Sequence, residues 1–147
     1  MSYRINRLVA GLFLGSALAV SGAMAQSATT FGDKLGFMPR NDAVAPTIGG
    51  TGEVTAMLDG NSLTIDGEFE GMVGNVIDVA VHYGPIAGDV GEQFATLSAE
   101  GDNSGTFSGT IELDDEQLAA LQNNSVYVIV RSDSNDRGEL RAWLWAR

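Results

Sequence analysis

Few side chains in this sequence have clear chemical potential. The 147-residue chain has one histidine, His82, and no cysteine. One imidazole excludes a two-histidine zinc site or an HExxH helix within the chain, and the lack of thiols excludes disulfides, thiolate metal sites and cysteine nucleophiles. His82 could be a lone ligand, an acid–base group or a hydrogen-bonded strand residue. No Gly-x-Ser-x-Gly elbow accompanies it, so we expect no catalysis, no cofactor and no metal.

The end of the chain offers aromatic and cationic side chains on one surface. On the last two predicted strands, apolar alternation turns one set of side chains away from the core, and that set includes Glu139. Aromatic residues and arginine are enriched at protein interfaces, so these side chains predict a docking surface for a protein or glycan partner, with both tryptophans at least partly exposed. Its residues are Tyr127, Arg131, Arg141, Trp143 and Trp145. The alternative is that the 26–50 segment or a loop covers this surface, because large bare apolar patches are rare on monomers.

An acidic turn between these strands imitates part of a calcium loop. Residues 133–138, Asp-Ser-Asn-Asp-Arg-Gly, are similar to the first half of an EF-hand loop. Arg137 stands at the fifth position and Leu144 at the twelfth, where oxygen ligands are required, so an EF-hand is excluded. A looser oxygen site there, or around residues 114–116, stays an alternative, although Asp114 is better explained as a helix N-cap.

Residues 1–25 have the composition of an export signal. Arg4 and Arg7 precede an uncharged apolar run over residues 8–20, and residues 23–25, Ala-Met-Ala, form a small-x-small cleavage pattern. The run is short for a bilayer span and no second one follows, so we expect a periplasmic or secreted protein whose mature chain has no membrane span. Cleavage would leave six basic and nineteen acidic residues, a net charge of −13, which excludes nucleic-acid binding.

Apolar and polar side chains alternate in short runs beyond residue 50. The runs predict strands near residues 53–58, 63–70, 75–83, 94–100, 106–113, 126–132 and 139–146. Asp114 and Gln117 form a capping-box pattern for a short helix near 115–122, which Asn123 and Asn124 would end. Residues 26–50 predict an irregular arm, with one short edge strand at 35–38, ahead of a β domain at 51–147. We therefore expect an all-β fold, an antiparallel β-sandwich or barrel with one short helix.

The ordered set of motifs resembles the chordin-like (CHRD) domain family, in the form of a bacterial exported member. The resemblance covers about residues 33–147 and rests on residues 51–59 with 63–65, residues 81–85 (Val-His-Tyr-Gly-Pro), residues 105–109, residues 115–121, residues 126–130 and residues 138–141. It implies an antiparallel sandwich or barrel, immunoglobulin-like or similar in architecture to copper/zinc superoxide dismutase. It implies no general biochemical activity.

The sequence departs from this family where chemistry would be expected. The family's middle strand ends in His-x-His-Gly-Pro, and here Val81 and Tyr83 stand at the two histidine positions, while Arg131 stands at a third. If those histidines bind metal in relatives, this chain has lost the site. The comparison puts Tyr83 on the functional face, whereas alternation buries Tyr83 and leaves His82 outward. Both readings stay open, because a strand covered on both sides would fit either.

These observations predict an exported, single-domain β module without catalytic activity, which binds or supports a partner. His82 and Tyr83 join the five residues of the closing strands as candidate binding residues. The alternative is a periplasmic metal-binding or redox protein, with His82 and nearby carboxylates as the remnant of a site.

Overall fold

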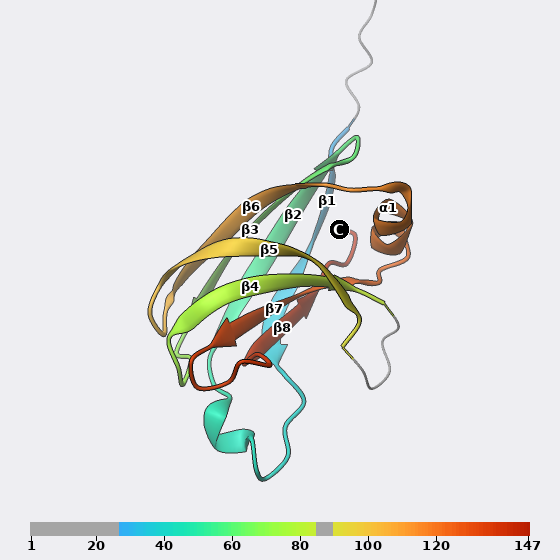
Figure 1. The fold of residues 1–147 in the computed structure, drawn as a ribbon. Helices are drawn as coiled ribbons and strands as arrows, with labels where there is room; N and C mark the ends of the chain where they lie inside the picture. Colours follow the sequence, from blue (N-terminus) through green and yellow to red (C-terminus); the bar gives the residue numbers. More distant parts are fainter. Residues whose placement is uncertain (1–26, 85–89) are drawn as a thin grey trace, which may run out of the picture.

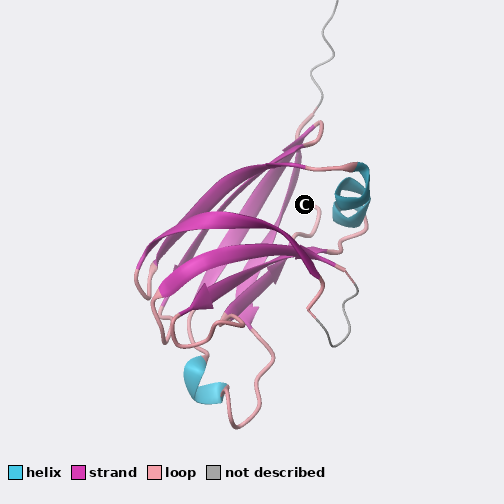
Figure 2. Cartoon of the chain, viewed as in Figure 1, coloured by secondary structure: helices cyan, strands magenta, loops and turns pink. Residues whose placement is uncertain are grey.

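The computed structural model describes residues 27–84 and 90–147. The predicted export signal at residues 1–25 lies outside the described residues. Within them, the chain forms eight strands, one α-helix and one short 3-10 helix (Figures 1 and 2). The strands are β1 (Thr29–Phe37), β2 (Thr51–Asp59), β3 (Ser62–Glu70), β4 (Val76–Tyr83), β5 (Glu92–Gly101), β6 (Gly105–Glu112), β7 (Val126–Ser132) and β8 (Leu140–Trp143), and the helices are η1 (Ala45–Thr47) and α1 (Asp115–Gln122).

The strands form one closed barrel in the order β1-β2-β3-β6-β5-β4-β7-β8, and every neighbouring pair is antiparallel. The barrel closes where Gly36 and Phe37 of β1 pair with Arg141 and Leu140 of β8. The prediction of an all-β antiparallel fold with one short helix is confirmed. Among the described residues, no helix combines the length and the apolar character needed to cross a bilayer.

The helix α1 begins as the sequence predicts. The Asp114 carboxylate accepts a hydrogen bond from the Gln117 backbone N–H (2.8 Å), and the Gln117 side-chain oxygen accepts one from the Asp114 backbone N–H (3.1 Å). This reciprocal pair satisfies two of the backbone donors that a helix start leaves without partners. Asn124, with φ of 57°, ends the helical segment in a left-handed conformation.

The barrel interior is filled by the alternate residues of each strand. Val54 and Ala56 of β2, and Leu63 and Ile65 of β3, are buried, while the side chains between them are exposed. Phe107 of β6 is buried in the barrel interior and packs over its β3 partner, Gly67. A Cβ at Gly67 would lie 2.1 Å from the Phe107 ring, so this close approach requires glycine.

The prediction of an irregular arm over residues 26–50 is wrong for residues 29–34, which belong to β1. The short strand expected at 35–38 is the end of β1, and it is not an edge strand, because β1 pairs with both β2 and β8. Only Phe31 and Leu35 mark the inner face of this strand, and glycines interrupt the pattern between and after them. Gly32, with φ of 153°, lets β2 approach so closely that a Cβ there would lie 2.3 Å from the Val54 carbonyl oxygen. The irregular segment is therefore residues 38–50, which we call the arm; it lies at one end of the barrel, between β1 and β2 (Figure 1).

Candidate functional site

The arm covers part of the outer face of β7 and β8. Met38 and Ile48 of the arm pack with Tyr127 and Ile129 of β7 in a second apolar cluster outside the barrel, which Trp143 joins from its edge. Tyr127 is only 2% exposed. Its expected place on an open docking surface is therefore wrong, because the arm buries it in the way that the alternative described.

An aromatic row runs outward from this buried cluster. The His82 and Tyr127 rings stack at 5.4 Å with 8° between their planes, and the Tyr127 and Trp143 centroids are 4.4 Å apart. Trp145 continues the row, 6.1 Å from Trp143. Trp143 is partly exposed and Trp145 is 38% exposed, so the row starts in the protein and ends in solvent.

His82 and Tyr127 both hold the backbone of Gly91. The His82 Nδ1 lies 2.9 Å from the Gly91 carbonyl oxygen, and the Gly91 N–H donates to the Tyr127 hydroxyl. A carbonyl only accepts, so Nδ1 must carry the proton, which leaves Nε2 for any other role. His82 thus has the structural role of a hydrogen-bonded strand residue.

Strand β4 is covered on both sides. Val81 and Tyr83 face the barrel interior, where Tyr83 meets the Phe94 ring edge-on at 5.5 Å. Ala80 and His82 face outward, yet both are buried, and His82 is 7% exposed. The structure thus decides between the two readings of this strand: Tyr83 faces inward and His82 outward, as alternation indicates. His82 is nevertheless covered, because the chain at Gly91 and the ring of Tyr127 lie against it.

Tyr83 does not belong to the same surface as the tryptophans. It faces inward near α1, where burial, and then the negative charges of Glu116 and Glu92, raise the pKa of its phenol above the ordinary value. The sheet separates it from Trp143 and Trp145, so the structure does not join it to a docking surface with them.

Arg131 faces outward but already has a partner. Its Nε and Nη2 donate to the two carboxylate oxygens of Asp78 at 2.6 and 2.5 Å, and these hydrogen bonds raise the pKa of Arg131 above its usual value. The pairing of β4 with β7 shifts its register between Val76 and Asp78, and Ile77, at this irregularity, points outward. This bidentate pair fixes the Arg131 guanidinium to β4 and engages its Nε–H and Nη2–H donors within the protein.

Glu139, expected on the outer face, is fully buried. Its carboxylate accepts four hydrogen bonds: Oε2 from the N–H groups of Gly49 (3.1 Å) and Val73 (2.8 Å), and Oε1 from the N–H of Gly74 (2.8 Å) and the hydroxyl of Ser132. Strand β8 starts one residue later than predicted, so alternation does not govern this position. Glu139 ties together the end of the arm, the β3–β4 loop and β7.

Glu139 also holds the start of the arm, since its carbonyl oxygen accepts from the Met38 N–H at 2.9 Å. A third tie joins Asn135 Nδ2 to Thr47 Oγ1 at 3.2 Å. Hydrogen bonds therefore join both ends of the arm to the β7–β8 turn, and they fix the position of the arm relative to that turn.

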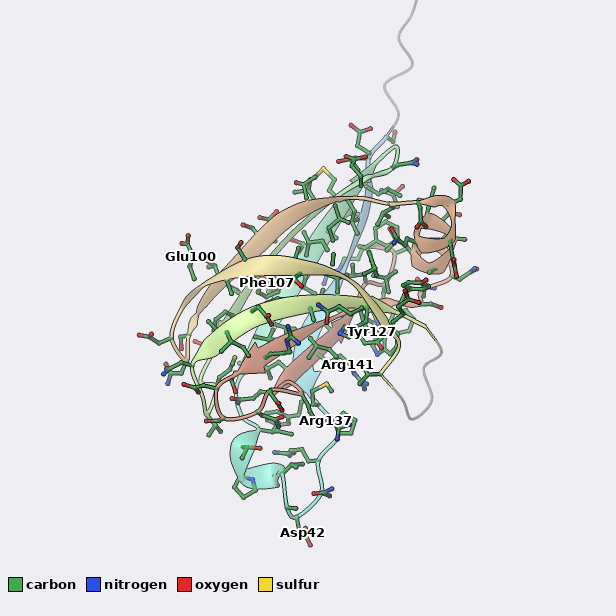
Figure 3. The ribbon with its side chains drawn as sticks, in the orientation of Figure 1. Asp42, Glu100, Phe107, Tyr127, Arg137 and Arg141 are labelled. Carbon is green, nitrogen blue, oxygen red and sulfur yellow. The ribbon has the colours of Figure 1, made fainter. Side chains whose placement is uncertain are left out.

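Between the arm and the β7–β8 turn lies a groove of about 280 Å³. Arg141, expected from the sequence, lines it, and its guanidinium lies 5.6 Å from the Trp143 ring centroid. Figure 3 shows Tyr127, Arg141 and Arg137 following one another along this side of the barrel toward the arm. The groove is lined by Met38, Pro39, Asn41, Val44, Ile48, Val90, Asn135, Arg137, Gly138 and Arg141.

Sequence reasoning missed most of this lining. Met38, Val44 and Ile48 are apolar residues of an irregular segment, so no periodicity marks them as a wall. The sequence pattern presents Arg137 only as a residue that does not fit a calcium loop. The one available signal was three large apolar residues in a segment otherwise rich in polar residues and prolines.

The oxygen ligands suggested for calcium serve local structure. Asp133 accepts from the Asn75 backbone N–H (2.8 Å) and from its side-chain amide, and Asn135 Oδ1 accepts from the Arg137 N–H (3.2 Å). Asp114 caps α1. Within residues 27–84 and 90–147, no group of three His, Asp or Glu side chains is arranged to hold a metal ion.

The family match covers the arm, the groove and the aromatic row except Trp145, which follows the matched range. The CHRD domain matches residues 38–144. The chain belongs to the CHRD domain family. CHRD domains are extracellular or exported modules and are not a known enzyme family. No curated protein and no solved structure matches the chain significantly.

The three positions compared with family histidines do not meet in this CHRD domain. Val81 and Tyr83 face the barrel interior, while Arg131 faces outward and binds Asp78. The aromatic and cationic side chains that remain together and reach solvent are Arg141, Trp143 and Trp145, which we call the tryptophan surface.

Proposed function

We propose that this protein is a periplasmic or secreted CHRD module without catalytic activity, and that it docks a partner through the tryptophan surface. One observation carries the proposal: Trp145 is 38% exposed at the end of an aromatic row whose other end, at Tyr127, is buried. An exposed indole supported in this way is already ordered before a partner arrives. The entropic cost of ordering it on binding is therefore small.

The chemistry of the surface favours recognition of a macromolecule. Tryptophan and arginine are the residues that most often dominate binding energy at interfaces, where removal of one such side chain costs about 2 kcal/mol or more. The Arg141 guanidinium lies over Trp143, which restricts its motion while leaving its N–H donors available. A partner that covers Trp145 would thus meet a preorganised donor beside an apolar platform.

Trp145→Ala tests this proposal against a matched control. Met57→Ala removes a large apolar side chain that is more exposed than Trp145 and lies on β2, outside the tryptophan surface. We expect Trp145→Ala to weaken retention of exported proteins or glycans on the immobilised protein by at least about thirtyfold, and Met57→Ala to leave it unchanged. Equal retention by both variants and the parent protein would contradict the proposal.

Elemental analysis separates this function from a metal-binding or redox role. Protein purified without chelators is expected to be free of stoichiometric metal and to unfold at the same urea concentration with and without a chelator. One metal ion per chain, with lower stability after chelation, would favour the metal-binding alternative and count against docking as the main role.

A further inference from the structure

We propose that the groove between the arm and the β7–β8 turn binds the C-terminal residue of an extended polypeptide, with an apolar side chain in the groove and the terminal carboxylate on Arg137 and Arg141. This inference rests on the proposed docking function and names the class of partner. It follows from three properties of the groove: its cations, its size and its lining.

The cations are unusual for so acidic a protein. Residues 27–147 carry six basic and nineteen acidic side chains, and two of the six line this one groove. The ion pair found among the described residues joins Arg131 to Asp78, so within those residues neither Arg137 nor Arg141 has a carboxylate partner. Two guanidinium groups without such a partner recognise a carboxylate through charge-assisted, planar hydrogen bonds.

The net negative charge does not prevent this recognition, but it limits the ligand. At physiological ionic strength the Debye length is about 8 Å, so distant acidic side chains are screened while the two local arginines act directly. A polyanion would extend beyond this radius and be repelled by the rest of the surface. A single carboxylate at the end of a chain is the anion that fits.

The size of the groove is that of one residue. Its volume of about 280 Å³ lies just below the roughly 300–1,000 Å³ typical of sites for drug-sized ligands. One leucine-like side chain with its carboxylate suits that volume, whereas a helix or an oligosaccharide does not.

The lining matches an apolar residue within an extended chain. Met38, Val44 and Ile48 offer apolar walls, and Asn41 and Asn135 offer side-chain amides. Amides of this kind can bind the peptide groups that precede a terminal residue. The preceding residues of such a ligand would continue past Arg141 toward Trp143, since Arg141 lines the groove and lies over that ring.

Titration of the ¹⁵N-labelled protein with two peptide pools tests the inference. Both pools are N-acetylated pentapeptides with mixed residues at four positions and Leu, Val or Phe at the last; one pool ends in a carboxylate and the other in a carboxamide. The signals to follow are the side-chain Nε–Hε groups of Arg137 and Arg141 and the backbone amide of Gly138. We expect the acid pool to saturate these shifts at a concentration at least about fivefold lower than the amide pool.

Three variants complete the test. Arg137→Gln, at an exposed position, and Arg141→Gln are each expected to weaken acid binding and to remove the difference between the pools. Arg147→Gln makes the same charge change, but its guanidinium donates to Gly32 O away from the groove (3.2 Å), so we expect unchanged binding. Dispersed amide spectra show that each variant is folded.

Other outcomes of these titrations would contradict the inference. Equal binding of acid and amide pools, or an equal loss in the Arg147→Gln control, would overturn the inference. N-acetyl-leucine or octanoate binding as tightly as the acid pool would assign the groove to a small carboxylate and overturn the polypeptide assignment. Failure of the peptides while Trp145→Ala still abolishes partner retention would refute the groove ligand and leave the docking function standing.

Discussion

Replacing Glu139 with glutamine is expected to destabilise the fold by about 3 kcal/mol. The buried carboxylate accepts four hydrogen bonds, three of them from backbone N–H groups that can only donate. Glutamine keeps the shape of the side chain but offers one oxygen and one NH₂ group. In the better orientation its NH₂ replaces Oε1, where Ser132 can turn to accept, and the Gly74 N–H loses its acceptor.

The magnitude follows from this loss and from weaker remaining bonds. A buried N–H without a partner costs about 1–3 kcal/mol, and the bonds from Gly49 and Val73 each lose about 1 kcal/mol when a charged acceptor becomes neutral. Relief from burying a charge offsets part of the sum. In the other orientation the glutamine NH₂ would replace Oε2, so the N–H groups of Gly49 and Val73 would both face a donor, and the loss of stability would be larger.

Urea unfolding at pH 7, followed by far-UV circular dichroism, measures the effect. For a protein of this size, with a slope of about 1–3 kcal/mol per molar urea, the midpoint should fall by roughly 1–3 M with no change in slope. Glu112→Gln is the matched control, because Glu112 is exposed on β6, and should change stability by less than about 0.5 kcal/mol. A loss below about 1 kcal/mol for Glu139→Gln would refute the role given to this carboxylate.

Three further changes should have separate effects. Tyr127→Phe leaves the Gly91 N–H without its acceptor and should cost about 1–2 kcal/mol in urea unfolding, with faster hydrogen exchange at Gly91; unchanged exchange would count against that bond. A double-mutant cycle of Asp78→Asn and Arg131→Gln should give a coupling of about 1 kcal/mol, and additivity would show that the pair contributes nothing. Because the pKa of Tyr83 is raised in the folded protein, the unfolded chain loses this proton at a lower pH than the folded one. The contribution of Tyr83 to the free energy of unfolding is therefore fully present below about pH 10, and it is lost as the pH rises through the folded pKa. Tyr83→Phe should reduce that alkaline loss, and an identical pH profile would contradict the raised pKa.

The elements that local chemistry determines could be predicted from the sequence. The capping box of Asp114 and Gln117 lies within four residues, and the structure has it. The strands from residue 51 onward alternate because one side of each faces the interior, so seven of the eight were predictable. Of strand β1 only the end was predictable, as the short strand expected at 35–38, because its two glycines break the alternation and its pairing with β2 and β8 depends on residues far along the chain.

The candidate site was predictable only as a set of outward-facing side chains. Period-two alternation places Tyr127 and Arg141 on the outer face, and the structure agrees. Alternation says nothing about what covers that face, so the burial of Tyr127 under Met38 and Ile48 required the fold of an irregular segment. Glu139 was misplaced for the same reason, since turn residues follow no period.

Photo-cross-linking from position 145 tests the central claim, that the tryptophan surface docks a partner, most directly. A benzophenone amino acid replaces Trp145 in the full chain, produced in cells that export it, and the same amino acid replaces Met57 as the control. On irradiation we expect a discrete adduct of higher mass from position 145 and none from position 57. No adduct from position 145, or equal adducts from both positions, would contradict the claim.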